Sequence, residues 1–141
     1  MYKKLLCVLL LAFSISACKK SNNKPACEMQ ACTAMFAYLG IVYNNHNGDA
    51  AQVKDVTIIN LRTGKTITPP SYPPAASFVA GFVLIASDGT KDEYSAEGDD
   101  VSITATSVTT GQVKKAIIKV SGGGCNCHIA KVSGPETVKF D

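Results

Sequence analysis

Five side chains of this sequence have the types and spacing to bind a metal or to form covalent links with one another. They are Cys27, Cys32, Cys125, Cys127 and His128. Thiolates and imidazole, with Met29 and Met35 nearby in the sequence, are soft ligands of the kind that copper(I) or zinc accepts. The spacing differs from that of a zinc finger, in which two residues separate the paired cysteines. A metal-handling protein is therefore the alternative interpretation of this cluster, not the favoured one.

Disulfide bonds are the favoured role for the four cysteines, because the chain begins with an export signal and disulfides persist outside the cytoplasm. Four cysteines allow three pairings. A bond between Cys125 and Cys127 would close a small, strained ring. We therefore expect two bridges that join the two ends of the domain, in either of the two remaining pairings, with His128 at an outward-facing strand position.

Acidic residues are concentrated between positions 88 and 100. They are Asp88, Asp92, Glu93, Glu97, Asp99 and Asp100. Oxygen-rich loops of this kind can bind calcium, and the candidate ligands are Asp88, Asp92, Glu93, Asp99 and Asp100. The order does not match an EF-hand loop, and charged hairpin tips on a solvated surface explain the cluster as well. No metal site is favoured.

No catalytic set stands out in the sequence. There are two histidines, and His46 lies in an asparagine-rich turn over residues 44–49, so no Ser-His-Asp or Cys-His arrangement can be argued. The chain has no Cys-x-x-Cys motif of a thiol-redox enzyme. Glycines 122–124 precede an expected strand, not a helix, and so indicate a loose hairpin loop without phosphate-binding amides. We expect a non-enzymatic protein with no cofactor.

Residues 1–17 have the three parts of a signal peptide: a basic start, an apolar run and small residues. The apolar run is too short to span a bilayer. The order Ile15-Ser16-Ala17-Cys18 resembles the bacterial lipobox. That resemblance implies that residues 1–17 are removed, and that Cys18 is acylated and anchors the chain in the lipid bilayer.

Residues 18–26 are expected to form a flexible, solvated tether that holds the domain off the membrane, because they are mostly polar. Lys19 differs from the aspartate that retains lipoproteins in the inner membrane, so the outer membrane is the expected location. The sequence KKSNN after Cys18 also lacks the acidic residues of surface-export signals. This departure favours the periplasmic face of the outer membrane.

Charge argues against nucleic acid as a partner. Of the 14 basic residues, two lie in residues 1–17, so the mature chain has 12 basic and 11 acidic residues. Binding to a phosphate backbone requires a basic patch, and a nearly neutral domain does not provide one. Envelope proteins and glycans remain the expected partners.

Residues 27–141 are long enough for one domain, and β-branched residues dominate it. Strands are expected over residues 31–43, 52–61, 66–68, 77–86, 101–108, 112–121, 125–132 and 136–140. Residues 26–38 could instead be helical. The continuous apolar run at 77–86 predicts a central strand. Near residues 115–116 the alternation is broken, which allows a bulge. About seven to nine short strands predict a single antiparallel β-sandwich, immunoglobulin-like or transthyretin-like, with a small closed barrel as the alternative.

Most of the chain resembles the small lipoproteins common in Bacteroidota-type bacteria. The resemblance rests on the lipobox followed by two lysines, on the start CxxxxCT, on VTIINLRTGKTI and on the close GCNCHIAKVSGPETVKF. It implies a lipid-anchored envelope protein, but no activity that can be transferred to particular residues. The expected function is a binding or scaffold module for another envelope protein or a glycan.

Overall fold

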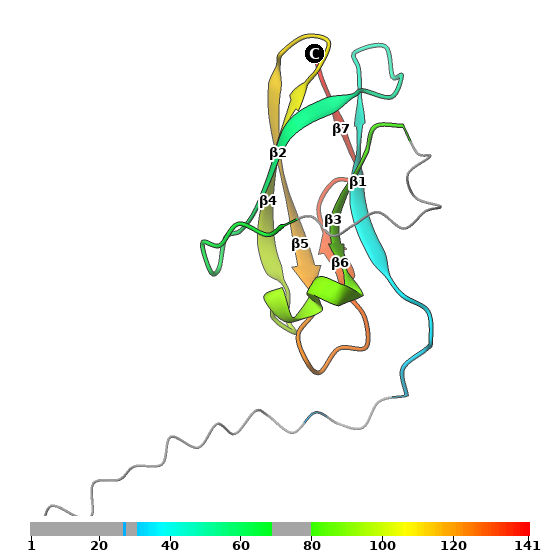
Figure 1. Cartoon of the computed structure of the whole chain (residues 1–141), viewed down its shortest axis with the longest axis vertical. Coiled ribbons are helices and arrows are strands. Elements are labelled where there is room, and N and C mark those ends of the chain that lie inside the picture. The colour runs from blue at the N-terminus through cyan, green and yellow to red at the C-terminus, as the bar shows by residue number, and fades with distance from the viewer. Residues whose placement is uncertain (1–26, 28–30, 69–79) are drawn as a thin grey trace, which may run out of the picture.

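Seven strands in two sheets make up the part of the chain that the computed structural model describes, which is residue 27, residues 31–68 and residues 80–141 (Figure 1). One sheet has the order β3-β1-β7 and the other the order β2-β4-β5-β6. The strands are β1 (Tyr38–Asn44), β2 (Val53–Asn60), β3 (Phe82–Ser87), β4 (Asp99–Ser107), β5 (Val113–Ser121), β6 (Ala130–Ser133) and β7 (Thr137–Lys139), with the 3-10 helix η3 (Asp88–Glu93) after β3. The predicted β-sandwich is confirmed.

Alternation of apolar and polar residues explains the four-stranded sheet. Along β4, the side chains of Val101, Ile103 and Ala105 are fully buried, as their spacing predicts. β5 pairs with β4 in continuous antiparallel register from Val113 to Val120, so the bulge predicted near residues 115–116 is wrong. The shift in register lies instead on the other side of β5, between Lys119 and Val120 where it pairs with β6.

The core lies between the two sheets and, among the described residues, is aliphatic apart from three aromatic side chains. Tyr43 of β1 and Phe140, which follows β7, are buried and stack with ring centroids 5.6 Å apart. Tyr94, which follows η3, is also buried. Burial raises the pKa of Tyr43 to about 12, because an ionised phenol would be poorly solvated there. β1 and β7 are neighbours in the three-stranded sheet, so the first and last strands of the domain are held together by the stacked pair Tyr43 and Phe140.

One pair of strands departs from the antiparallel pattern that the sequence predicts. β7 runs parallel to β1, with Val42 opposite Thr137 and Asn44 opposite Lys139. The chain reaches this position by leaving β6 through Gly134, whose φ is +108°. A Cβ at Gly134 would lie 2.7 Å from the Cα of Ile118. Glycine therefore allows the chain to cross closely over β5 and change sheets.

The apolar run predicted as the central strand is an edge strand. β3 begins at Phe82, and residues 77–79 of the predicted range lie outside the described residues. Val83, Leu84, Ile85 and Ala86 are buried as expected, but β1 occupies the centre of the three-stranded sheet. A continuous apolar run reports burial on both faces and does not report which strands flank it.

Three further local predictions are wrong. Residues 31–37 form neither the strand predicted over 31–43, since β1 begins only at Tyr38, nor the helix that was its alternative. Residues 66–68 form only an isolated bridge, between Ile59 and Thr66. The strand predicted at 125–132 begins only at Ala130, because residues 122–129 form a loop that two disulfides tie to the N-terminal segment. His128 is therefore a loop residue and not an outward-facing strand residue.

The sandwich has two distinct ends (Figure 1). At one end lie residues 31–37, η3 and the loop 122–129, and we call this the clasp end. At the other, which we call the free end, lie the turns at 45–49 and 108–112 and the C-terminus, Asp141. No helix in the described part of the chain is long and apolar enough to cross a membrane.

Candidate functional site

Two disulfides hold the N-terminal segment at the clasp end. They join Cys27 to Cys125 and Cys32 to Cys127, across 98 and 95 residues of sequence. The prediction of two end-to-end bridges is confirmed, and of the two pairings that the sequence left possible the structure has this one. The bridges leave no free thiolate among the four cysteines, so the set Cys27, Cys32, Cys125, Cys127 and His128 does not provide the copper or zinc ligands of the alternative hypothesis.

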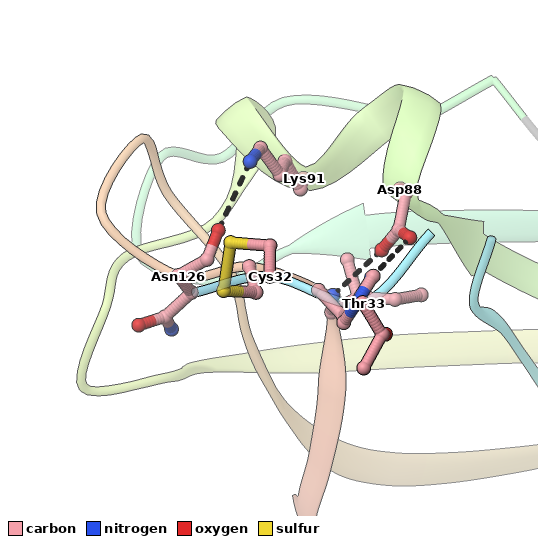
Figure 2. Close-up of a disulfide and its surroundings, with 8 residues drawn as sticks. Cys32, Thr33, Asp88, Lys91 and Asn126 are labelled. Carbon is pink, nitrogen blue, oxygen red and sulfur yellow. Dashed lines mark hydrogen bonds and ion pairs between the residues drawn. A yellow bond between two sulfur atoms is a disulfide. The ribbon is translucent and has the colours of Figure 1, made fainter. Parts of the chain in front are cut away.

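A polar cluster lies directly beside the second disulfide (Figure 2). The Oδ2 of Asp88 is 2.6 Å from Nδ1 of His128, and Nε2 of His128 is 2.8 Å from the hydroxyl of Thr33. An ionised carboxylate can only accept hydrogen bonds, so Nδ1 of His128 carries a hydrogen and donates a hydrogen bond to Asp88. Asp88 also accepts from the backbone amides of Ala37 at 2.8 Å and Ile129 at 2.9 Å. We call the two disulfides with Thr33, Asp88 and His128 the clasp.

Sequence reasoning missed this cluster, since its three polar members are far apart in the chain. A signal for part of it is nevertheless present. Thr33 directly follows Cys32 and His128 directly follows Cys127, so the Cys32–Cys127 bridge necessarily brings these two neighbours together. Asp88 has no such signal, and only the position of η3 beside the loop places it there.

Asp88, His128 and Thr33 are hydrogen-bonded in the order carboxylate, imidazole, hydroxyl, which is also the order in a hydrolytic triad. A triad also needs amides directed at the developing oxyanion. The two amides at this site, of Ala37 and Ile129, donate to Asp88 itself. Asp88 therefore acts as a bridge between the N-terminal segment and the loop 122–129, and this structural role accounts for the contacts of its carboxylate.

Asp88 is ionised under ordinary conditions. Burial acts to raise the pKa of Asp88, but the hydrogen bonds from the Ala37 amide, His128 and the Ile129 amide outweigh burial and hold the pKa below its usual range. A lowered pKa in the folded state means that this stabilisation is fully present above the unfolded value of about 3.9 and is lost as the pH falls below it.

We expect Asp88→Ala to lower the free energy of unfolding by about 2 kcal/mol, because two backbone amides and an imidazole lose a charged acceptor. Hydrogen exchange at the amides of Ala37 and Ile129 should accelerate more than exchange in β4. Asp92→Ala, an exposed carboxylate of the same short helix, is the matched control and should leave stability within about 0.5 kcal/mol. Equal losses from both variants would contradict this role of Asp88.

Gly122 and Gly123 are packed parts of the clasp end, whereas Gly124 is exposed, so the loop is not the loose hairpin predicted. The amide of Gly122 donates to the Ser95 carbonyl at 2.9 Å, and the amide of Gly123 donates to the Lys91 carbonyl at 2.7 Å. The Nζ of Lys91 in turn donates to the carbonyl of Asn126 at 2.9 Å (Figure 2). The loop thus lies directly on η3 and the segment that follows it.

This packing predicts different effects for two neighbouring glycines. A Cβ at position 122 would lie 2.5 Å from the Lys91 carbonyl oxygen, whereas the nearest atom to a Cβ at position 124 is 4.0 Å away. Gly122→Ala should therefore cost about 2 kcal/mol of unfolding free energy through overpacking, and Gly124→Ala less than about 0.5 kcal/mol. Thermal or urea unfolding of the two variants measures the difference, and similar values would show that the loop is not held against η3.

The acidic residues between positions 88 and 100 do not form a calcium site. Within residues 27, 31–68 and 80–141, no group of three or more histidine, cysteine or acidic side chains is placed to hold a metal ion. Of the candidates Asp88, Asp92, Glu93, Asp99 and Asp100, two have other roles. Asp88 belongs to the clasp, and Asp99 binds protein donors.

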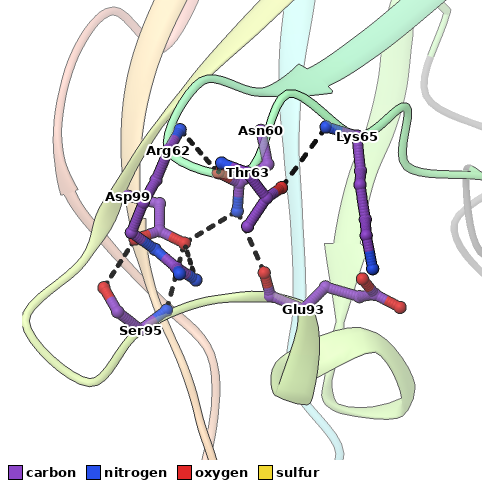
Figure 3. A network of polar contacts seen from close by, with 7 residues as sticks. All are labelled: Asn60, Arg62, Thr63, Lys65, Glu93, Ser95 and Asp99. Atoms are coloured by element: carbon purple, nitrogen blue, oxygen red, sulfur yellow. Dashed lines mark hydrogen bonds and ion pairs between the residues drawn. The ribbon is translucent and has the colours of Figure 1, made fainter.

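Asp99 is the centre of a buried polar network at the start of β4 (Figure 3). Its side chain is 1% exposed. It accepts from Nδ2 of Asn60 at 2.7 Å, from Nε and Nη2 of Arg62 at 2.6 and 2.9 Å, and from the hydroxyl of Ser95 at 2.6 Å. Burial acts to raise the pKa of Asp99, but these donors outweigh it and hold the pKa far below its usual range. The network fixes the turn after β2 to the segment that leads into β4.

Several hollows in the described surface have sizes compatible with a small ligand, one of them, about 320 Å³, beside Arg62 and Asp99. Two others lie away from that network. The larger, about 410 Å³, is apolar and lies between β2 and β3. The chain before β3 includes residues 69–79, which lie outside the described residues, and no ligand is inferred for it. The other, about 320 Å³, is at the free end, and its lining residues are Asn45, His46, Asn47, Thr109, Thr110, Phe140 and Asp141.

Hydrogen bonds hold the free-end hollow in shape. The side-chain amide of Asn47 donates to Asp49 at 2.6 Å within its turn. Asp141 is bound by Lys114 at 2.7 Å and by Gln112 at 2.8 Å. The hydrogen bonds from Lys114 and Gln112 lower the pKa of the Asp141 side chain. Amide, hydroxyl and imidazole groups therefore meet at the end of the domain opposite the clasp.

Comparison of the chain with protein families, with curated proteins and with solved structures finds no significant match to any of them. Function is therefore inferred from the residues of this chain, from the clasp at one end of its sandwich and from the hollow at the other.

Proposed function

We propose that this chain is a lipid-anchored protein of the bacterial cell envelope, held by an acylated Cys18 in the outer membrane and facing the periplasm. Its sandwich acts as a non-enzymatic binding or scaffold module for a glycan or another envelope protein. One observation carries the proposal: the disulfides attach the N-terminal segment of the domain to one end of the sandwich, and the turns at 45–49 and 108–112 lie at the opposite end.

The anchoring half of the proposal rests on the sequence Ile15-Ser16-Ala17-Cys18, which lies outside the described residues. Two cysteines lie outside the domain, Cys7 within the apolar run and Cys18 after it, and they form a matched pair. Cys18→Ala should abolish both the acylation and the cleavage that removes residues 1–17, whereas Cys7→Ala should affect neither. Intact mass of the mature protein from the membrane fraction measures both outcomes, and a Cys18→Ala protein that is still acylated and membrane-bound would refute the proposal.

The binding half is supported by the free-end hollow, whose amide and hydroxyl groups suit a hydroxyl-rich or peptide ligand. A photo-reactive residue at Thr110 in intact cells should form an adduct with a cell-wall glycan or an envelope protein. The same residue at Thr57, exposed in the middle of β2, is the control and should form none. Equal adducts at the two positions would refute a binding surface at the free end.

A further inference from the structure

We propose that Met35, Phe36 and Tyr38, which we call the apolar arm, contact the surface of the bilayer to which Cys18 is attached. This inference rests on the proposed lipid anchor and goes further, because it assigns an orientation to the domain. The clasp end would then touch the membrane, and the free end would point away from it.

The apolar arm places three exposed apolar side chains in one short segment. The side chains of Met35, Phe36 and Tyr38 are 78%, 53% and 43% exposed, and they lie within four consecutive positions. The rings of Phe36 and Tyr38 contact each other with centroids 5.0 Å apart. Single exposed apolar residues are ordinary on a protein surface, but a contiguous group marks a surface that another apolar phase covers.

The covalent structure determines which end of the sandwich is near the lipid. Eight residues lie between Cys18 and Cys27, and an extended chain spans at most about 3.6 Å per residue, so Cys27 stays within roughly 30 Å of the acylated residue. Cys27 is bonded to Cys125 of the loop 122–129. The apolar arm begins three residues after Cys32, which is bonded to Cys127 of the same loop. The arm therefore belongs to the end that faces the bilayer.

The chemistry of this end suits the membrane interface. Phenylalanine and methionine can enter the boundary of the acyl chains, while tyrosine keeps its hydroxyl among the headgroups. Lys19, Lys20 and Lys24 lie between the anchor and Cys27, where they complement anionic headgroups. The free end, in contrast, carries Asn45, Asn47 and the side-chain carboxylate of Asp141, which favour water.

The chain contains no tryptophan, so a single introduced tryptophan reports on one position only. The test uses the full acylated protein, with Phe36→Trp, in vesicles of phosphatidylethanolamine and phosphatidylglycerol. We expect a blue shift of emission and quenching by lipids with brominated acyl chains. Val113→Trp is the matched control, because Val113 is 59% exposed and lies near the free end, and it should show neither effect.

Each result has a defined meaning. If Cys18 is acylated and the protein is vesicle-bound, but the Phe36→Trp variant emits like the Val113→Trp variant, the bilayer contact is refuted and the proposed anchor stands. If Cys18 is not acylated and the protein does not bind vesicles, the proposed function is refuted together with this inference. A blue shift of the Phe36→Trp variant in native envelope membranes but not in lipid vesicles would assign the arm to a protein partner and overturn the bilayer contact.

Discussion

Removal of both disulfides should lower the free energy of unfolding by about 7 kcal/mol, and removal of either one by only about 2.5 kcal/mol. The reason is that the two bridges close almost the same loop, of 98 and 95 residues. One long loop is worth about 4.7 kcal/mol in the chain-entropy model. Once it is closed, the second bridge adds only a small ring of nine residues, between 27 and 32 and between 125 and 127, which is worth about 2.5 kcal/mol.

The experiment compares three variants with the oxidised protein by urea unfolding. Cys27→Ser with Cys125→Ser removes the first bridge, Cys32→Ser with Cys127→Ser removes the second, and the four changes together remove both. The combined loss should exceed the sum of the two single-bridge losses by about 2 kcal/mol. Strict additivity would contradict the shared-loop explanation. A typical domain has only about 5–15 kcal/mol of stability, so we expect the variant without bridges to be largely unfolded at body temperature.

Asp99→Ala should lower the free energy of unfolding by about 3 kcal/mol. The carboxylate is buried, and its removal leaves the Asn60 amide, itself 1% exposed, without its charged acceptor. The amide and hydroxyl of Ser95 also lose their acceptor. Asp100→Ala, the exposed neighbour, is the control and should stay within about 0.5 kcal/mol of the native protein.

Arg62→Ala separates the two parts of this network. The Arg62 side chain is 53% exposed, so it keeps much of its hydration without Asp99, and its ion pair is screened by solvent. We therefore expect Arg62→Ala to cost far less than Asp99→Ala. Comparable losses for the two variants would mean that the ion pair, and not the buried hydrogen bonds of Asp99, stabilises the start of β4.

The same carboxylate predicts a particular dependence of stability on pH. The pKa of Asp99 is lowered in the folded state, so its contribution is present above the unfolded pKa of about 3.9 and is lost as the pH falls below that value. Asp99→Asn removes this titration. Stability of the variant should thus fall less steeply than that of the native protein below about pH 4, as measured by urea unfolding at a series of pH values.

Local patterns in the sequence were sufficient for the fold class and for much of the four-stranded sheet. β2, β4 and β5 lie within about two residues of their predicted ranges, because alternation with a period of two reports which face of a strand is buried. The end-to-end character of the disulfides was also predictable, because neighbouring cysteines on so short a segment make a strained ring. These inferences depend only on residues that are close together in the chain.

Only the tertiary structure decided which cysteines pair, that β7 runs parallel to β1, and that β3 lies at an edge. It also brought Asp88 to His128, 40 residues away, and His128 to Thr33, 95 residues away. Each of these depends on which distant segments share an end of the sandwich, and no local pattern encodes that. Asp88 and Asp99 illustrate the difference, because both are acidic residues of one loop-rich stretch of the sequence. After folding, Asp88 belongs to the clasp and Asp99 is the centre of a buried network.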